Sequence, residues 1–246
     1  MEWSDEGIVL AVRRHGESGA VVSLLTAAHG RHAGLVRGGA ARRMRGFLQP
    51  GNTVSANWRA RLEEHLGTLT VEPMVSRAGL YDQPGPLSAM TSATALVEAA
   101  LPERAPHPEL YRLLGELLDA LDRPGWPESY IRWELFLLAD LGFGLDLTSC
   151  AATGGNDKLA WVSPKSGRAV SLSAGEPWRD KLLPLPRFLS PEGGRPDLAQ
   201  LDEGLRLTGW FLERHVFSAH NARSPDARER LIGYLRGLDA ARRDIV

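Results

Sequence analysis

Seven arginines near the start of the chain are the residues whose type and spacing most clearly indicate chemistry. They lie within Ser18–Leu62, a stretch of 45 residues without Asp or Glu, although the overall frequency of 30 acidic residues in 246 would place about five there. Unopposed guanidinium groups create a positive potential, and each can form paired hydrogen bonds with phosphate oxygens. We therefore predict a nucleic-acid-binding site that comprises Arg31, Arg37, Arg42, Arg43, Arg45, Arg59 and Arg61.

The competing interpretation of this stretch is a solvated basic loop that has no partner. The chain as a whole carries a formal charge of -1, so any attraction for phosphate must come from local segregation of charge. Gly38, Gly39 and Gly46 flank the central arginines and predict a flexible loop whose backbone can approach a nucleic-acid strand.

Aromatic side chains that could stack on bases are few in this region. Trp58 alternates in phase with Val54 and Ala56, which favours packing in a core, while Phe47 is open to either role. Binding through the phosphate backbone is therefore favoured over sequence-specific readout.

Motifs of enzymes are missing from the sequence. It contains no P-loop, no nucleophile-elbow serine and no H-E-x-x-H pair. His215 and His220 are five residues apart, a spacing that does not share one face of an α-helix. A nuclease that uses Glu63, Glu64 and a histidine is the rival from another class. We expect a binding protein that is not an enzyme and needs no cofactor.

Cys150 is the single cysteine and precedes a hairpin, an arrangement that resembles a zinc ribbon. A zinc ribbon needs four soft ligands in paired C-x₂-C spacing, but Thr153 occupies the second position and no other cysteine follows. We expect no metal here and a packed or free thiol instead.

The elements that must position the arginines are β-strands. Five short strands are predicted, and five strands with glycine-rich turns indicate a small barrel of the OB-fold type, with an SH3-like barrel as the structural rival. This barrel would form a DNA-binding domain over residues 1–80. The strands are expected at Glu6–Arg14, Ala20–Thr26, Gly30–Val36, Val54–Arg61 and Leu66–Val71, with Ile8, Leu10 and Val12 on one face of the first.

Beyond a proline-rich linker the periodicity changes to that of α-helices, which predicts a helical domain over residues 81–246. A small β-hairpin insert at about 148–173 interrupts it, so the fold class is α+β. The hairpin pairs Leu159–Val162 with Ala169–Leu172. The helices are expected to begin at Ser88, Pro108, Pro127, Asp197 and Ser224.

The lone cysteine fits a reducing compartment, and the acidic N-terminus is unlike a signal peptide. No apolar run is long enough to span a bilayer. A cytoplasmic, nucleoid-associated protein without a membrane partner is expected.

Motifs in order along the chain resemble those of the RecO family of bacterial DNA repair and recombination mediator proteins. Near the N-terminus they are Gly7–Leu10, His15–Ser18, Val36–Gly39 and Leu48–Gly51. In the second half they are Arg132–Leu135, Leu141–Gly144, Cys150–Ala152 and Ser163–Gly167.

The resemblance implies an OB domain followed by helices, binding of single- and double-stranded DNA, and annealing of complementary strands. It also implies RecR as a partner and binding of the acidic C-terminal tail of single-stranded-DNA-binding protein (SSB), which assists the loading of RecA. Arg112 and Arg132 are weak candidates for the tail site, since either can pair with a neighbouring carboxylate. Some members hold zinc through four cysteines, and this chain departs from them because it retains only Cys150. The alternative function is a single-stranded nucleic-acid-binding or scaffolding protein that does not anneal.

Overall fold

A computed structural model of the chain describes residues 1–62, 64–156, 158–218 and 221–243. The chain divides into two compact units, each of which we describe by itself. Unit 1 comprises Met1–Pro124 with Pro225–Arg228, and unit 2 comprises Gly125–Ser224 with Glu229–Val246. The two domains expected from the sequence, residues 1–80 and 81–246, stay a prediction.

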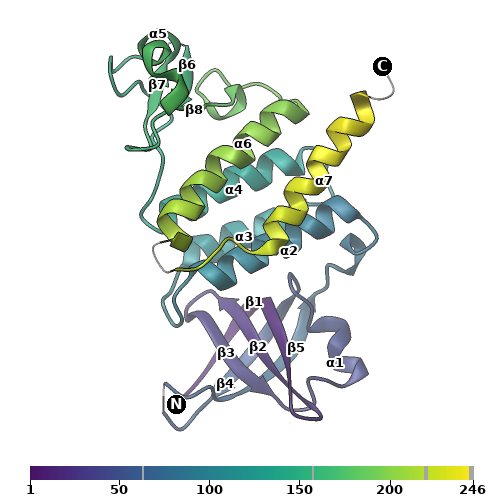
Figure 1. The fold of residues 1–246 in the computed structure, drawn as a ribbon. Coiled ribbons are helices and arrows are strands. Elements are labelled where there is room, and N and C mark those ends of the chain that lie inside the picture. Colours follow the sequence, from purple (N-terminus) through teal and green to yellow (C-terminus); the bar gives the residue numbers. More distant parts are fainter. Residues whose placement is uncertain (63, 157, 219–220, 244–246) are drawn as a thin grey trace. The chain divides into compact units, whose positions relative to one another are not determined.

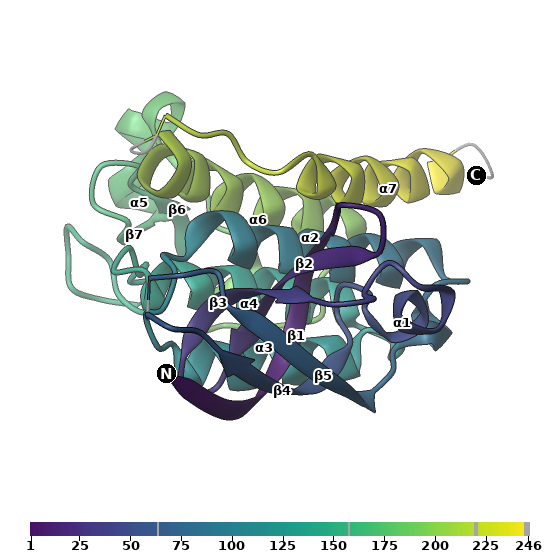
Figure 2. The ribbon, with the colours of Figure 1, turned by 90° about the horizontal axis from the view of Figure 1, so that it is seen from below.

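Five strands of unit 1 close into a barrel in the order β1-β2-β3-β5-β4, and β4 pairs back onto β1. All neighbours are antiparallel except β3 and β5, which run parallel where Leu35 meets Thr68. Figure 1 shows the barrel, and Figure 2 shows the crossing of its strands from below. The strands are β1 (Glu2–His15), β2 (Gly19–Thr26), β3 (Gly30–Val36), β4 (Thr53–Arg59) and β5 (Thr68–Val75).

The core of the barrel comes from residues that alternate along each strand. Val54, Ala56 and Trp58 of β4 are buried in it, as their phase predicts. The face expected for β1 is wrong, because a β-bulge between Val9 and Ala11 shifts the alternation. Val9 and Val12 therefore face the barrel core, while Ile8 and Leu10 are buried outside it, where α2 packs on β1.

Three strands have bounds that differ by two residues or more from those expected. β1 begins at Glu2 instead of Glu6 because its first residues pair with the end of β4. β4 ends two residues early, at Arg59, and β5 runs from Thr68 to Val75 instead of from Leu66 to Val71. The alternation in the sequence identifies the buried part of each strand. The exposed ends depend on backbone pairing, which the alternation does not reveal.

Unit 1 also contains the short turn η1 (Ala78–Leu80) and the helices α2 (Pro84–Ala100) and α3 (Pro108–Ala120). α2 packs against β1 and α3 against β2. The start expected at Ser88 is wrong, because prolines in the first turn need no amide donor and the helix begins at Pro84. The Ser88 hydroxyl donates to the Pro84 carbonyl within the helix (2.7 Å) instead of capping it. Pro108 does open α3, as expected.

Unit 2 is mainly helical. α4 (Trp126–Asp140) packs on α6 (Leu198–Phe211), and α6 continues into a π-helical segment, η4 (Leu212–Phe217). Asp197 caps α6 by accepting a hydrogen bond from the Gln200 amide (2.8 Å). The last helix is α7 (Asp226–Arg243), in which Arg236 bonds Asp202 of α6 (2.7 Å). None of the helices in the described ranges is both long and apolar enough to cross a lipid bilayer.

The insert in unit 2 forms a three-stranded sheet. β6 (Leu159–Val162) and β7 (Ala169–Ser171) make the expected hairpin, and the unexpected β8 (Leu183–Pro184) pairs with the other edge of β6. Between β7 and β8 lie α5 (Leu172–Gly175) and η2 (Glu176–Lys181), and η3 (Arg187–Leu189) follows. Val162 is fully buried, and the Trp161 ring lies against Gly175 so closely that a Cβ there would be 2.2 Å from Cδ1.

Candidate nucleic-acid interface

The central arginines of the acid-free stretch lie on a helix and not on a flexible loop. α1 (Arg42–Phe47) is a six-residue helix between β3 and β4. The Arg45 amide donates to the Ala41 carbonyl (3.0 Å), the Leu48 amide to the Met44 carbonyl (2.9 Å), and Gln49 Nε2 to the Arg45 carbonyl (2.7 Å). The flanking glycines suggested flexibility, but the apolar residues between the arginines anchor the segment.

Two side chains fix which way α1 faces. Met44 and Phe47 are three residues apart, so they lie on one face of the helix, and both pack against the barrel core. Arg42, Arg43 and Arg45 are consequently exposed. Phe47 is half-buried, and through this packing it holds α1 on the barrel.

The register of the barrel brings other arginines to one edge. Leu35 of β3 pairs with Thr68 of β5, and Thr68 pairs with Arg59 at the end of β4. Arg37 follows Leu35 by two residues, so the ends of three strands place Arg37, Arg59 and Arg61 at this edge. A shallow hollow of about 620 Å³ opens here, lined by Met1, Arg59, Ala60, Arg61, His65, Gly67 and Thr68.

A second hollow, of about 400 Å³, lies beside α1 and has arginines on two sides. Arg45 comes from α1, and Arg14 comes from the end of β1, where it pairs with Ala20. The Ala40 amide donates to the Ser18 carbonyl (3.0 Å), which ties the connection before α1 to the β1–β2 turn. Sequence reasoning missed Arg14 because it precedes the acid-free stretch and is followed closely by Glu17.

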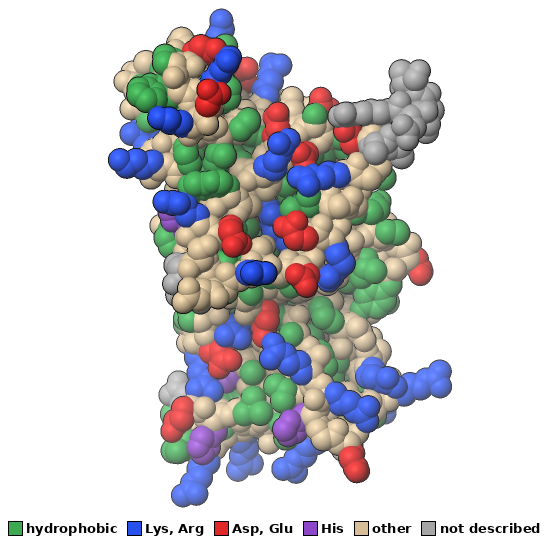
Figure 3. All heavy atoms as spheres, in the orientation of Figure 1, with side chains coloured by type: hydrophobic (Ala, Val, Ile, Leu, Met, Phe, Trp, Pro, Cys, Tyr) green, Lys and Arg blue, Asp and Glu red, His purple; other side chains and the backbone are tan. Residues whose placement is uncertain are grey.

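None of the ion pairs between described residues involves Arg14, Arg37, Arg42, Arg43, Arg45, Arg59 or Arg61, and all seven are exposed. Figure 3 shows Lys and Arg side chains gathered at the lower end of the barrel and at its side near α1. These guanidinium groups are available to an external anion.

Arg31 differs from the other predicted residues. Its side chain is 16 % exposed, and Nη1 lies 3.6 Å from Glu98 and 3.5 Å from Glu103. Its Nε donates to the Leu101 carbonyl (2.9 Å). These contacts assign Arg31 a structural role in joining β3 to the end of α2, and we leave it out of the interface proposed below.

The aromatic residues of the barrel form a cluster that the sequence did not reveal. Trp58 is buried, and its Nε1 donates to the Leu66 carbonyl (2.9 Å). Trp3 stacks on His29 at 4.3 Å and on Trp58 at 5.8 Å, and His32 packs edge-on between the two indoles. Burial, reinforced by the charges of Arg104 and His29, lowers the pKa of His32 to about 4. Its neighbours are far apart in sequence, so no local pattern marked this cluster.

The two weak candidates for a partner site are both bound to carboxylates. Arg112 on α3 donates to Glu109 and Glu116, and these bonds raise its pKa above its usual value. Arg132 on α4 donates to Glu128 (2.9 Å) and to the Phe188 carbonyl (2.6 Å), and its guanidinium lies 5.7 Å from the centre of the Phe188 ring. Arg112 is therefore occupied on both sides, while Arg132 pairs with one carboxylate and covers the buried Phe188 ring.

The other candidate residues that the structure describes form no group suited to binding a metal ion. Cys150 is buried, and its sulfur accepts from the Ser171 amide at 3.2 Å. Although burial opposes ionisation, hydrogen bonds from Thr153, Ser171 and Ala152 lower the pKa of the Cys150 thiol to about 6. Glu63 and His220 lie outside the described residues. Across the described ranges, no group of three His, Cys, Asp or Glu side chains is arranged to hold a metal ion.

Comparison with known proteins gives matches over both halves of the chain. The family models "Recombination protein O N terminal" and "Recombination protein O C terminal" match residues 1–77 and 83–224. A DNA repair protein RecO of Rhodospirillum centenum is 56% identical over 237 residues, which cover 94% of each chain. One of Rhodospirillum rubrum is 51% identical over 251 residues and covers 99% of this chain and 100% of its own. One of Cereibacter sphaeroides is 51% identical over 236 residues, 96% of this chain and 98% of its own.

Proposed function

The chain belongs to the RecO family of DNA repair proteins, and on that basis we propose that it binds single- and double-stranded DNA through arginines of its barrel. The proposed contacts are Arg42, Arg43 and Arg45 on α1, Arg37, Arg59 and Arg61 at the strand ends, and Arg14. The barrel is proposed to be of the OB type. The insert is proposed to be a zinc-ribbon-like hairpin without its zinc ligands.

One observation supports this proposal above the others. Arg42, Arg43 and Arg45 are exposed on a helix whose other face is packed on the barrel core, and none pairs with a carboxylate among the described residues. A helix held in this way presents three cations with little further loss of backbone entropy when DNA binds. Each contact releases counterions from DNA, so these residues act through phosphate and not through base identity.

We further propose that the protein anneals complementary strands and acts as a recombination mediator without covalent chemistry. Screening of phosphate charge lowers the repulsion between two strands and lets them pair. With RecR, it would help load RecA onto single strands coated by SSB. It is proposed to work at the nucleoid.

The acidic tail of SSB is proposed to bind unit 2 near Arg132. An acidic peptide requires an accessible cation, and the Arg132 side chain is 51% exposed although it pairs with Glu128. The Phe188 ring beneath it is buried, so the apolar end of the peptide would need another surface. Arg112 is the poorer candidate because two carboxylates occupy its guanidinium. Unchanged binding of the tail peptide to Arg132→Ala would remove Arg132 from this site.

The test of the DNA interface is a salt titration of a fluorescent single strand. We expect Arg42→Glu/Arg43→Glu/Arg45→Glu to weaken binding more than roughly tenfold at low salt and to reduce the slope of log K against log salt by about 2, from about 0.7 for each lost phosphate contact. Arg123→Glu/Lys158→Glu/Arg195→Glu is the matched control, since it changes the net charge equally at exposed cations that are not part of α1 or of the other proposed contacts.

Equal affinity of the α1 variant and wild type would reject α1 as the interface. A strand-annealing assay on the same proteins then separates the two functions. Tight binding by the wild type without faster annealing would favour the alternative of a single-strand-binding or scaffolding protein.

A further inference from the structure

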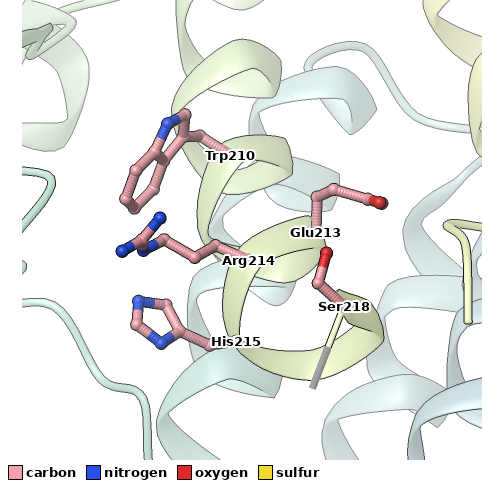
Figure 4. A pocket seen from close by; sticks show the side chains of 5 residues that line it. All are labelled: Trp210, Glu213, Arg214, His215 and Ser218. Carbon is pink, nitrogen blue, oxygen red and sulfur yellow. The ribbon is translucent and has the colours of Figure 1, made fainter. Parts of the chain in front are cut away.

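A hollow on unit 2 holds a second set of planar and cationic side chains that the barrel interface does not use. Its volume is about 740 Å³, and it is lined by Trp210, Glu213, Arg214, His215 and Ser218. Figure 4 shows Trp210, Arg214 and His215 projecting to the same side of the helix, with the guanidinium between the two rings, while Glu213 points to the other side.

Stacking contacts hold Trp210, Arg214 and His215 together, and we call these three residues the row. The Arg214 guanidinium lies 5.3 Å from the centre of the Trp210 ring, and the Trp210 and His215 rings are 6.2 Å apart. His215 also stacks on Phe211 (5.9 Å, 14°) and on Phe143 (5.2 Å, 23°), and the Phe143 side chain is 39% exposed. The row therefore continues into an exposed aromatic ring.

The π-helical segment explains how residues 210 and 215 come together. In an α-helix, residues five apart lie on different faces, and this was the reason for separating His215 from His220 by sequence. A π turn joins residue i to residue i+5, and such turns are frequent at functional sites. Trp210 lies at the end of α6 and His215 lies within η4 (Leu212–Phe217), so the wider turn begins between them, and their ring centres are 6.2 Å apart. The separation expected between His215 and His220 stays a prediction, because His220 lies outside the described residues.

On the side where Trp210, Arg214 and His215 project, the hollow has a positive charge from Arg214 and no carboxylate beside it among the described residues. Arg214 is exposed and takes part in none of the ion pairs between described residues. Glu213 is held on the opposite side, where its carboxylate accepts from the Ser224 amide at 3.2 Å. A ligand of this hollow must therefore offer an anionic group to Arg214 and a flat face to the rings.

We propose that the hollow formed by Trp210, Arg214 and His215 binds a nucleotide of single-stranded DNA, with phosphate at Arg214 and the base stacked on an exposed aromatic face of the row. This inference rests on the proposed DNA-binding function and adds a second DNA site, on unit 2. One molecule would then hold single strands at two places, as annealing requires. A base stacked on an aromatic ring adds affinity without sequence preference.

The chemistry of the hollow favours a nucleotide over an acidic peptide. The exposed groups are flat rings and a guanidinium plane, which match the π-face of a base. An acidic peptide with an apolar end would use only the cation and an apolar surface, whereas a nucleotide would also use the planar faces of the guanidinium and the rings. The peptide is therefore an outcome of the test and not part of the proposal.

The test measures the stoichiometry and position of short-strand binding. The probe is a single-stranded DNA oligonucleotide of about six nucleotides, within the size of a single OB-type site, that carries 5-iodo-2′-deoxyuridine for photo-crosslinking. We expect two oligonucleotides to bind each wild-type chain, with one crosslink in the peptide that contains residues 210–215. Trp210→Ala/Arg214→Glu should lose this crosslink and bind one oligonucleotide, at least roughly tenfold more weakly at the lost site.

Two further variants separate stacking from loss of structure. Trp210→Phe keeps a ring and should retain the second site, while Arg195→Glu is the matched charge control on unit 2, at an exposed arginine away from the hollow. The circular dichroism spectra of all variants should match that of the wild type.

The results distinguish failure of the inference from failure of the proposed function. Crosslinks confined to barrel peptides, with one oligonucleotide for each chain, would overturn the second site and leave the barrel interface intact. Absence of binding by the wild type would overturn both. If an Asp-rich peptide ending in Phe bound at Trp210 and the oligonucleotide did not bind there, the nucleotide assignment would be overturned.

Discussion

Two guanidinium nitrogens of Arg77 donate hydrogen bonds to Oδ1 of Asp119 on α3, Nε at 3.0 Å and Nη2 at 2.6 Å. The remaining nitrogen, Nη1, donates to the Gly51 carbonyl at 2.6 Å and to the Thr53 hydroxyl at 3.1 Å. The Arg77 side chain is 8% exposed, whereas that of Asp119 is 61% exposed. One buried cation thus connects the start of β4 to a helix of unit 1.

Arg77→Met is expected to lower the free energy of unfolding by about 2–4 kcal/mol, because it leaves the Gly51 carbonyl and its neighbours without a buried donor. Asp119→Asn should cost about 1 kcal/mol or less, since Asp119 is exposed and water replaces part of its contact. Urea denaturation measures both. Equal losses for the two variants would contradict the assignment of stability to the buried carbonyl contacts.

Arg31 and Arg42 should separate stability from DNA binding. Arg31→Gln is expected to reduce the free energy of unfolding by about 1–3 kcal/mol, because Glu98 and the Leu101 carbonyl lose a partly buried cationic donor. It should leave the salt slope of DNA binding unchanged. Arg42→Gln should have the opposite profile, with stability within about 0.5 kcal/mol of the wild type and a slope lower by about 0.7. A reduced slope in Arg31→Gln would return Arg31 to the interface.

His32 makes the stability of unit 1 depend on pH. Its pKa is about 4 in the folded chain and 6.5 in the unfolded one, so the unfolded chain binds the proton more tightly. Stability should therefore fall as the pH decreases from about 6.5 to about 4 and level off below, by about 3 kcal/mol in all. His32→Phe should flatten this dependence, while the exposed His15→Gln should retain it. Urea unfolding at a series of pH values measures the effect, and identical profiles for all three proteins would refute it.

Gly30 and Gly38 share a left-handed backbone but differ in their surroundings. Both have positive φ, +66° and +70°, yet a Cβ at Gly30 would lie 1.9 Å from the Ala105 carbonyl oxygen, while nothing lies within 4 Å of one at Gly38. Gly38→Ala should cost about 1 kcal/mol from the backbone alone. Gly30→Ala should cost at least about 3 kcal/mol, since the connection after α2 must move. Thermal unfolding compares the two variants. A similar decrease in the free energy of unfolding for both would show that the backbone at Ala105 moves away from the new Cβ at little cost.

Local patterns predicted much of this fold because burial repeats with the period of each element. The alternation of Val54, Ala56 and Trp58 predicted both the strand and its inner face. The leucines of α3 and the position of Pro108 predicted that helix. The same reasoning failed on β1, because a β-bulge shifts the alternation after Val9 and no residue there indicates a bulge in the sequence.

The sequence by itself determined that this chain is an α+β protein of the RecO family with a basic, acid-free segment on a small β-domain. These conclusions depend on composition, periodicity and order along the chain, which are local properties. Only the tertiary structure decided which arginines are available. Arg31 and Arg42 are equivalent in the sequence, but the fold of unit 1 places Arg31 beside Glu98 of α2, while the packing of Met44 and Phe47 leaves Arg42 exposed. Trp210 and Arg214 are four residues apart and share one helix face by sequence spacing, but the π-helical segment that contains His215 was not predicted, and only the structure shows the His215 ring 6.2 Å from that of Trp210. Neighbours across the fold set the availability of a charge, and residue type alone does not encode those neighbours.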